Sequence, residues 1–232
     1  MPLPIDVPSK VICIGLNYHD HAKESGLSIP TSPLIFGKWS TSLVGNDDPI
    51  VIPPGLDQID YEAELAVVID REARNVAPED ALGIVRGYTC FNDISARRIQ
   101  AQDVQWTRGK SFDSFGPIGP RLVGPADIGD PQALNIKCRV NGVTVQNGNT
   151  ANMIFSIPQI IAAVSRSTTL LPGDVIATGT PGGVGLARKP QLWLTPGDVV
   201  EVEIAGIGVL RNAVTASSAD TLSERLEAKS GV

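Results

Sequence analysis

Short apolar runs that end at glycine or proline constrain the fold of this chain more than any other feature. Of the 232 residues, 23 are glycine and 18 are proline, and β-branched residues dominate the apolar runs between them. Such frequent breaks are incompatible with the long amphipathic helices of a helical bundle. We therefore expect a mixed α/β chain that is predominantly β, with mostly antiparallel sheets and a few short helices.

Charge and cysteine content exclude several classes of protein. The formal charge is −6, from 19 basic against 25 acidic residues, which argues against a nucleic-acid partner. No apolar run approaches the roughly 20 residues of a membrane span, and residues 1–8 lack the features of a signal peptide. Cys13, Cys90 and Cys138 are widely spaced, which is typical of reduced core thiols. We expect a cytoplasmic protein without a membrane partner.

Local patterns predict most of the regular elements. We expect strands over 11–14, 61–69 and 87–92, short helices over 17–25, 78–85 and 95–102, and loop with edge strand over 29–54. Asn141-Gly142 predicts a type I′ hairpin within 134–146. Ser156 and Gln159 have capping-box spacing at the start of a helix over 156–167.

No linker divides the chain, so we predict one domain over residues 1–232. Residues 1–10 would be an N-terminal extension and residues 217–232 a C-terminal tail, which we expect to form an exposed, partly ordered helix. Two Pro-Gly-Asp turns, at 172–174 and 196–198, each precede an expected strand. Their similarity is too short to indicate a repeat.

Acidic residues cluster where an expected strand enters the core. Side chains alternate along a strand, so Asp60, Glu62 and Glu64 would share one face, and Asp93 ends another strand. Neighbouring carboxylates in a buried place require a proton or a cation between them. Oxygen ligands without paired Cys or His favour Mg²⁺, Mn²⁺ or Ca²⁺ over zinc. The alternative is a solvated edge strand.

Three further segments carry candidate chemistry. His21 and Glu24 are i,i+3 neighbours on the expected helix, where the carboxylate can orient the imidazole as a general base, although such pairs are also common on surfaces. Lys110 lies in a glycine-flanked turn and is either functional or a salt-bridge partner of the acids. The glycine-rich segment 178–185 lacks phosphate-loop spacing and is either a carboxylate-binding loop or a structural turn.

The joint order of these motifs resembles the fumarylacetoacetate hydrolase family, from about Val11 to Val214. The motifs are Asn17-Tyr18 through Glu24, Tyr61-Glu62-Ala63-Glu64-Leu65, Asn92-Asp93-Ile94-Ser95-Ala96-Arg97, Gly109-Lys110-Ser111-Phe112-Asp113 and Thr178-Gly179-Thr180-Pro181. The resemblance implies the family's β-roll fold, a single catalytic domain of the short subgroup and a homodimer.

The resemblance also implies roles for individual residues. Mg²⁺ or Mn²⁺ would be held by Glu62, Glu64 and Asp93. The catalytic residues would be Lys110 and the water-activating pair His21 and Glu24, and substrate would contact Arg97, Gln100 and Thr180. Arg98 departs from the family pattern, because many relatives carry an acidic residue there, and it leaves substrate choice open.

The expected activity is metal-dependent hydrolysis of the C–C bond of 2,4-dioxo acids, of the acylpyruvate or fumarylpyruvate type, to pyruvate and a carboxylic acid. Two alternatives share an enolate: decarboxylation of oxaloacetate or a carboxymethyl-oxo-hexenedioate, and isomerisation of a hydroxyheptadienedioate in aromatic catabolism. A non-catalytic β-roll that binds a metal or a 2-oxo acid is the alternative from another class.

Overall fold

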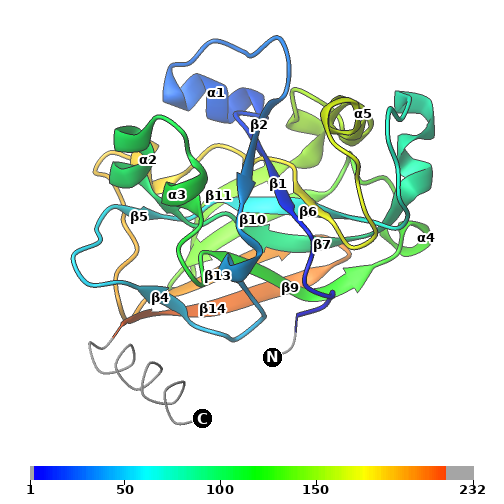
Figure 1. The fold of residues 1–232 in the computed structure, drawn as a ribbon. Helices are drawn as coiled ribbons and strands as arrows, with labels where there is room; N and C mark the ends of the chain where they lie inside the picture. The colour runs from blue at the N-terminus through cyan, green and yellow to red at the C-terminus, as the bar shows by residue number, and fades with distance from the viewer. Residues whose placement is uncertain (1–2, 218–232) are drawn as a thin grey trace.

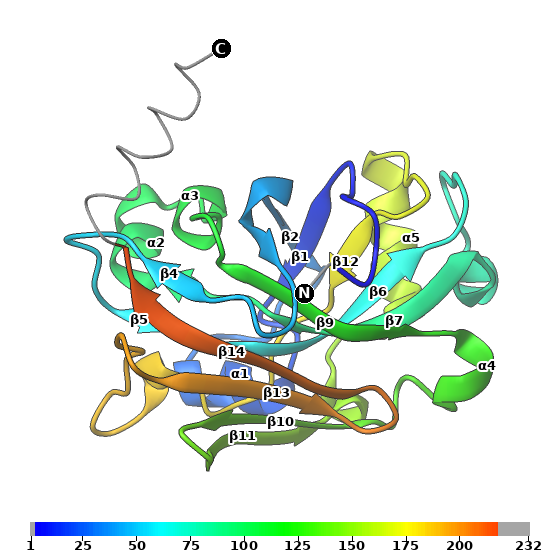
Figure 2. The same cartoon turned by 90° about the horizontal axis from the view of Figure 1, so that it is seen from below.

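Two curved sheets, one of seven strands and one of five, form the centre of the computed structural model, which describes residues 3–217 (Figures 1 and 2). The larger sheet has the order β2-β1-β12-β6-β7-β9-β3. In that order its strands are Leu34–Lys38, Val11–Gly15, Val175–Ala177, Ala63–Ile69, Val85–Asn92, Gly116–Val123 and Leu43–Val44. This sheet carries the strands on which the acidic motifs lie.

The smaller sheet has the order β11-β10-β13-β14-β4. Its strands are Val143–Asn149, Asn135–Val140, Val199–Ile204, Gly208–Ala216 and Ile50–Ile52, and a separate pair joins β5 (Ile59–Asp60) to β8 (Ser95–Ala96). Most pairings are antiparallel, as predicted; β1 with β12, β3 with β9 and β4 with β14 are parallel. The predominantly β fold is therefore confirmed.

Short helices surround the sheets (Figure 1). The α-helices are α1 (His19–Ser25), α2 (Arg97–Asp103), α3 (Thr107–Lys110), α4 (Pro125–Ile128) and α5 (Ile157–Ser167). The 3₁₀ turns are η1 (Ser40–Ser42), η2 (Pro78–Ile84), η3 (Thr150–Asn152) and η4 (Gly185–Ala187). The helix predicted over 95–102 begins two residues later, because Ser95 and Ala96 pair with β5.

Locally encoded features form as predicted. Asn141 and Gly142 both have positive φ, 52° and 79°, as a type I′ turn requires. Both hydrogen bonds of the capping box at Ser156 and Gln159 are present. The segment 29–54 supplies the outermost strands β2, β3 and β4. The predicted tail helix falls almost entirely outside the described residues.

The core lies between the two sheets, where β6 and β7 pack against β10, β13 and β14. All seven residues of β6 are buried because β7 and β12 flank the strand and apolar clusters pack on both faces of the sheet. Cys13, Cys90 and Cys138 are buried free thiols. None of the helices within residues 3–217 has the length and apolar character needed to span a membrane. The single catalytic domain, the homodimer and the cytoplasmic location stay predictions.

Candidate active site

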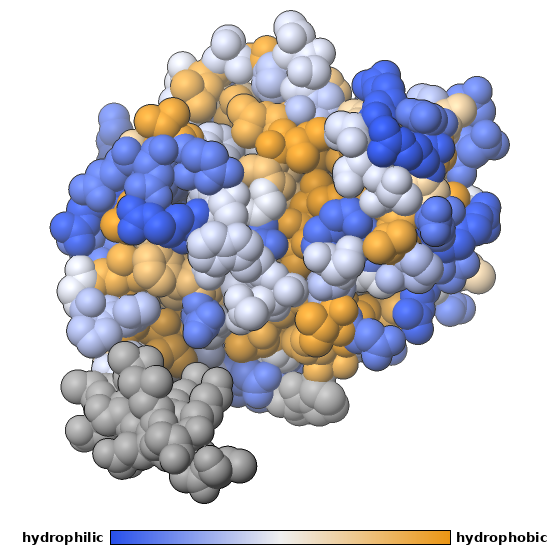
Figure 3. Space-filling model, in the orientation of Figure 1, coloured by the Kyte–Doolittle hydropathy of each residue, from blue (hydrophilic) through white to orange (hydrophobic). Residues whose placement is uncertain are grey.

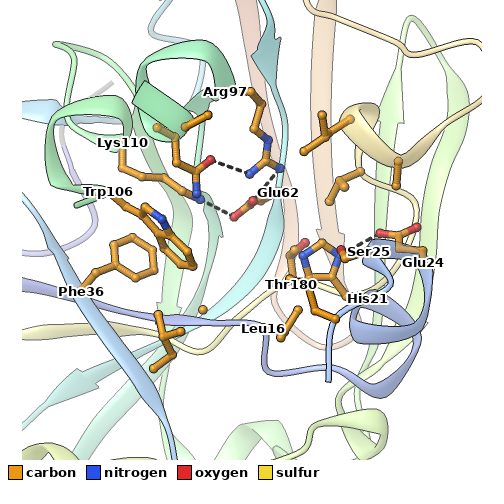
Figure 4. Close-up of a pocket in the computed structure, with 18 of the residues that line it drawn as sticks. Leu16, His21, Glu24, Ser25, Phe36, Glu62, Arg97, Trp106, Lys110 and Thr180 are labelled. Atoms are coloured by element: carbon orange, nitrogen blue, oxygen red, sulfur yellow. Dashed lines mark hydrogen bonds and ion pairs between the residues drawn. The ribbon is translucent and has the colours of Figure 1, made fainter. Parts of the chain in front are cut away.

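A cavity of about 860 Å³ opens beside the start of β6. Its walls come from α1, α2, α3, β2, the end of β1 and the loop after β12 (Figure 4). Eight of the nine residues expected to form the site line it, namely His21, Glu24, Glu62, Glu64, Arg97, Gln100, Lys110 and Thr180. The ninth, Asp93, is completely buried directly behind Lys110, whose Nζ lies 2.8 Å from Asp93 Oδ2.

The three expected metal ligands come together because β6 and β7 are antiparallel neighbours. The start of β6 meets the end of β7, with Ala63 opposite Asn92, and the Asp93 amide donates to the Glu62 carbonyl at 2.9 Å. One oxygen each of Glu62, Glu64 and Asp93 lie within 4.8 Å of one another, and all three residues are buried.

Asp60 does not join this cluster, although strand alternation suggested a shared face. The chain leaves strand geometry between β5 and β6, and Asp60 turns to a different set of donors. Its carboxylate accepts hydrogen bonds from the Gly185 amide at 2.7 Å and from Arg97 Nε at 2.8 Å.

Basic side chains surround the carboxylates. Lys110 Nζ lies 2.6 Å from Glu62 Oε2 as well as 2.8 Å from Asp93 Oδ2, so Lys110 is both a salt-bridge partner and a cavity residue. Arg97 bridges Asp60 and Glu62, with a 2.7 Å contact to Glu62 Oε1. Burial alone would raise the pKa of Glu62, but Lys110 and Arg97 lower it to about 2. Glu62 is thus held as a carboxylate.

Glu64 has less positive charge nearby than Glu62 has. It accepts a hydrogen bond from the Gly179 amide at 2.8 Å, but no basic side chain among residues 3–217 forms an ion pair with it. Burial, together with Asp93 and Glu62, raises its pKa well above the ordinary value. The four buried carboxylates Asp60, Glu62, Glu64 and Asp93 face three buried cations, Lys38, Arg97 and Lys110. The site is thus short of positive charge and offers oxygen ligands, a donor set that fits a hard divalent cation such as Mg²⁺ or Mn²⁺.

The glycine-rich loop after β12 binds carboxylates, but they belong to the protein itself. Gly179, Gly183 and Gly185 donate their amides to Glu64, Glu24 and Asp60, respectively, at 2.7–2.8 Å. A Cβ at Gly185 would lie 1.9 Å from the Leu192 carbonyl oxygen, and one at Gly183 2.3 Å from that of Val145. Glycine is therefore required for the close packing that places these amides.

His21 and Glu24 form the expected pair on α1. His21 Nδ1 lies 2.8 Å from Glu24 Oε1, while the second Glu24 oxygen accepts from the Gly183 amide at 2.7 Å. Figure 4 shows the imidazole between Glu24 and the cavity that contains Glu62. Glu24 thus fixes the imidazole and also attaches α1 to the glycine-rich loop.

Comparison with known proteins places the chain in one family. The model of the fumarylacetoacetate (FAA) hydrolase C-terminal family matches residues 10–215. The chain belongs to the fumarylacetoacetate hydrolase family. The human mitochondrial oxaloacetate tautomerase FAHD2A is 46% identical over 213 residues, which cover 91% of this chain and 68% of the relative.

Solved structures of family members have the same fold. A 2-hydroxyhepta-2,4-diene-1,7-dioate isomerase from Mycobacterium marinum superposes with a TM-score of 0.83 at 40% identity, covering 93% of this chain and 77% of the other. A fumarylacetoacetate hydrolase from Exiguobacterium antarcticum has a TM-score of 0.83 at 44% identity, covering 91% and 76%. Family membership is thus shown, and the reaction differs among relatives.

Some hydrogen-bonding groups of the expected substrate-binding residues are already bonded to other parts of the protein. Thr180 Oγ1 donates to the Ala63 carbonyl at 2.9 Å and accepts from Gln146 at 2.8 Å. Gln100 accepts from Arg97 through its side-chain oxygen at 3.1 Å, which leaves its amide nitrogen as a donor. Their roles toward substrate stay predictions.

Lys38 contacts the acidic cluster, although none of the sequence motifs includes it. Its buried Nζ donates to Asp93 Oδ1 at 2.7 Å, to the Ile94 carbonyl at 3.3 Å and to the Lys110 carbonyl. The available signal was a lysine that ends the apolar run Leu34–Gly37, since a lysine that is buried requires a carboxylate partner. Arg98, the departure from the family pattern, lies at the rim and pairs with Asp57 at 2.8 Å.

Proposed function

We propose that this chain interconverts the keto and enol forms of 2-oxo acids with the help of a divalent cation. The supporting observation is one cavity that combines the buried carboxylates Glu62, Glu64 and Asp93, the ammonium group of Lys110 and the oriented imidazole of His21. Two of the three relatives described above are named as a tautomerase and an isomerase, which favours isomerisation over the hydrolysis expected first.

Isomerisation requires a stabilised enolate. Removal of a proton from C3 of a 2-oxo acid leaves its electron pair delocalised onto the C2 oxygen. A bound Mg²⁺ or Mn²⁺ would act as a Lewis acid toward that oxygen. Lys110 adds a buried positive charge beside the metal ligands, since burial lowers its pKa but Asp93 and Glu62 raise it above the ordinary value. Lys110 thus stabilises negative charge as it develops.

His21 is the proposed proton carrier. When Nδ1–H donates to Glu24, Nε2 is left as the proton acceptor. His21 Nε2 removes the C3 proton, and the imidazolium then returns a proton to the enolate oxygen, or the reverse. Glu24 stabilises the intermediate imidazolium and keeps it oriented through its second bond, to Gly183.

Oxaloacetate with Mg²⁺ or Mn²⁺ tests the proposal through the ultraviolet absorbance of its enol. We expect accelerated interconversion, and a loss of about 10²–10⁴-fold in kcat/KM in His21→Ala. His19→Ala is the matched control, because His19 is exposed on the same helix and does not line the cavity. No acceleration over metal alone, either with oxaloacetate or with phenylpyruvate, would refute the proposal. Pyruvate and CO₂ as products would indicate the decarboxylase alternative instead.

A second candidate is hydrolysis of 2,4-dioxo acids, for which the His21–Glu24 pair would equally supply the general base. His21 would take a proton from water, whose oxygen adds to the C4 carbonyl. Cleavage of the C3–C4 bond then yields a carboxylic acid and the enolate of pyruvate, which is protonated at C3. Pyruvate release from acylpyruvates, lost in His21→Ala, tests this reaction; enol interconversion without pyruvate would exclude it.

A further inference from the structure

The cavity has an apolar side that neither the metal ligands nor the His21–Glu24 pair explains. The apolar wall consists of Leu16, which follows β1, Leu34 and Phe36 of β2, and Trp106, which precedes α3. The Phe36 and Trp106 rings pack edge to face, with centroids 5.3 Å apart and an interplanar angle of 72°. Figure 4 shows these two rings on the side of the cavity away from His21 and Glu24.

The backbone is adapted to this wall. A Cβ at Gly15 would lie 2.6 Å from Trp106 Cζ3 and 3.0 Å from Leu34 Cδ2, so glycine lets both side chains pack against the end of β1. The next residue, Leu16, has a φ of 52°, a left-handed conformation that leucine rarely adopts. Strain of this kind persists only where the surrounding structure imposes it, and it concentrates at functional sites.

The wall begins next to the catalytic lysine. Lys110 Nζ lies 5.3 Å from the centroid of the Phe36 ring. A 2-oxo acid whose oxygens lie near Lys110 would therefore place the rest of its carbon chain against Phe36 and Trp106. The cavity volume of about 860 Å³ is in the range of pockets for drug-sized ligands, well above the needs of a four-carbon acid.

Charge also disfavours a second carboxylate at the far end of the substrate. Each basic side chain that lines the cavity within residues 3–217 already has a carboxylate partner. The pairs are His21 with Glu24, Arg97 with Asp60 and Glu62, Arg98 with Asp57, and Lys110 with Glu62 and Asp93. A distal carboxylate would lose hydration without meeting an uncompensated cation, whereas an uncharged group would gain from burial.

We infer that the preferred substrates are 2-oxo acids that carry an uncharged apolar substituent, alkyl or aryl, and that the apolar wall binds this substituent. The inference rests on the proposed function for the 2-oxo acid end. Trp106 and Leu34 are then specificity-determining residues, and the wall has no part in the proton transfer.

Three unreactive probes separate the two ends of the substrate. Oxamate contains only the 2-oxo acid end, N-benzyloxamate adds an aryl arm, and N-oxalylglycine adds a carboxylate arm. Calorimetric titration with saturating Mn²⁺ is expected to show N-benzyloxamate binding at least about tenfold more tightly than N-oxalylglycine, a difference of about 1.4 kcal/mol.

Variants of the apolar wall test whether it causes the preference for the aryl probe. Trp106→Ala and Leu34→Ser should each reduce the ratio of the two affinities severalfold, and oxamate titrated into the same variants measures any change at the 2-oxo acid end. Trp39→Ala is the matched control for loss of an indole, because Trp39 is 56% exposed and does not line the cavity. If one of the two wall variants does not fold, the other still tests the inference.

The outcomes distinguish this inference from the proposed function. Equal or tighter binding of N-oxalylglycine overturns the inference, and so does a ratio that neither wall variant changes. A change of oligomeric state in Trp106→Ala with an unchanged ratio would assign the wall to a contact between copies of the chain. If oxamate does not bind and neither oxaloacetate nor phenylpyruvate is isomerised, the proposed function fails and the inference fails with it.

Discussion

Lys38 Nζ lies 2.7 Å from Asp93 Oδ1, in a place from which water is excluded. The same ammonium group donates to the main-chain carbonyls of Ile94 and Lys110. Its three hydrogens therefore have three acceptors, and the bond to Asp93 leaves Oδ2 facing Lys110. Lys38 thus positions one expected metal ligand and the backbone of Lys110 together.

Removal of this lysine should destabilise the protein strongly. Lys38→Met leaves a buried carboxylate and two carbonyls without their donor, and loss of one partner of a buried ion pair costs about 3–5 kcal/mol. Urea unfolding measures the change. In the control Arg211→Met, which breaks the exposed contact to Asp47, we expect less than about 1 kcal/mol. Similar stability of Lys38→Met and the parent would contradict the positioning role.

The acidic cluster should bind one divalent ion per chain. Glu62→Gln, Glu64→Gln and Asp93→Asn each retain side-chain shape but remove a charged oxygen ligand, so each should abolish Mn²⁺ binding in calorimetry. Glu72→Gln, at an exposed position outside the cavity, should bind like the parent. Unchanged affinity in all three cluster variants would remove the metal site from the proposal.

The metal-free protein should lose stability as pH rises. Because burial and the neighbouring carboxylates raise the folded-state pKa of Glu64 well above 4.5, the folded chain binds more protons there than the unfolded chain does. This contribution to stability is fully present below pH 4.5 and is lost as pH rises through the raised pKa.

Thermal unfolding in EDTA, from about pH 5 to about pH 8, measures this dependence. Tm should fall more steeply in the parent than in Glu64→Gln, which has no proton to lose at this position. Parallel curves for the two proteins would show that Glu64 is not the group responsible.

The segment 19–30 should become ordered when substrate binds. Within α1 only Ala22 is buried, and Leu27 and Ile29 are exposed, so few apolar contacts hold the segment. Glu24 provides its polar attachment to the glycine-rich loop. Hydrogen exchange of these amides should slow on addition of Mn²⁺ and oxalate, and less so in Glu24→Ala. Slow exchange that oxalate does not affect would argue against a closing segment.

Much of the fold follows from interactions within a few residues. Asn141 and Gly142 adopt positive φ, which both residue types tolerate, and Ser156 and Gln159 satisfy each other's backbone within a single turn. Proline and glycine over 29–54 weaken that segment as a central strand, which agrees with its place at the edges of both sheets. Such features could be predicted because the partners are adjacent in the chain.

The candidate site was only partly predictable. The clustering of Glu62, Glu64 and Asp93 could be predicted, because carboxylates at the ends of two buried strands have few other ways to have their charge compensated. The change of direction between β5 and β6, which removes Asp60 from the cluster, could not be predicted from alternation. It depends on Arg97 and the Gly185 amide, which lie 37 and 125 residues away.

By itself, the sequence determined the turns, the helix cap and the strand that enters the core, since these depend on short-range sterics. It also determined that the expected metal ligands are oxygen atoms, since this depends on the chemistry of single side chains. Only the tertiary structure decided which cation compensates which carboxylate. Lys38 and Asp93 are 55 residues apart, and Lys110 and Glu62 are 48 apart. Their pairing depends on tertiary contacts such as those of α3 with β2 and β8. Water is excluded there, which makes an unpaired charge too costly to retain.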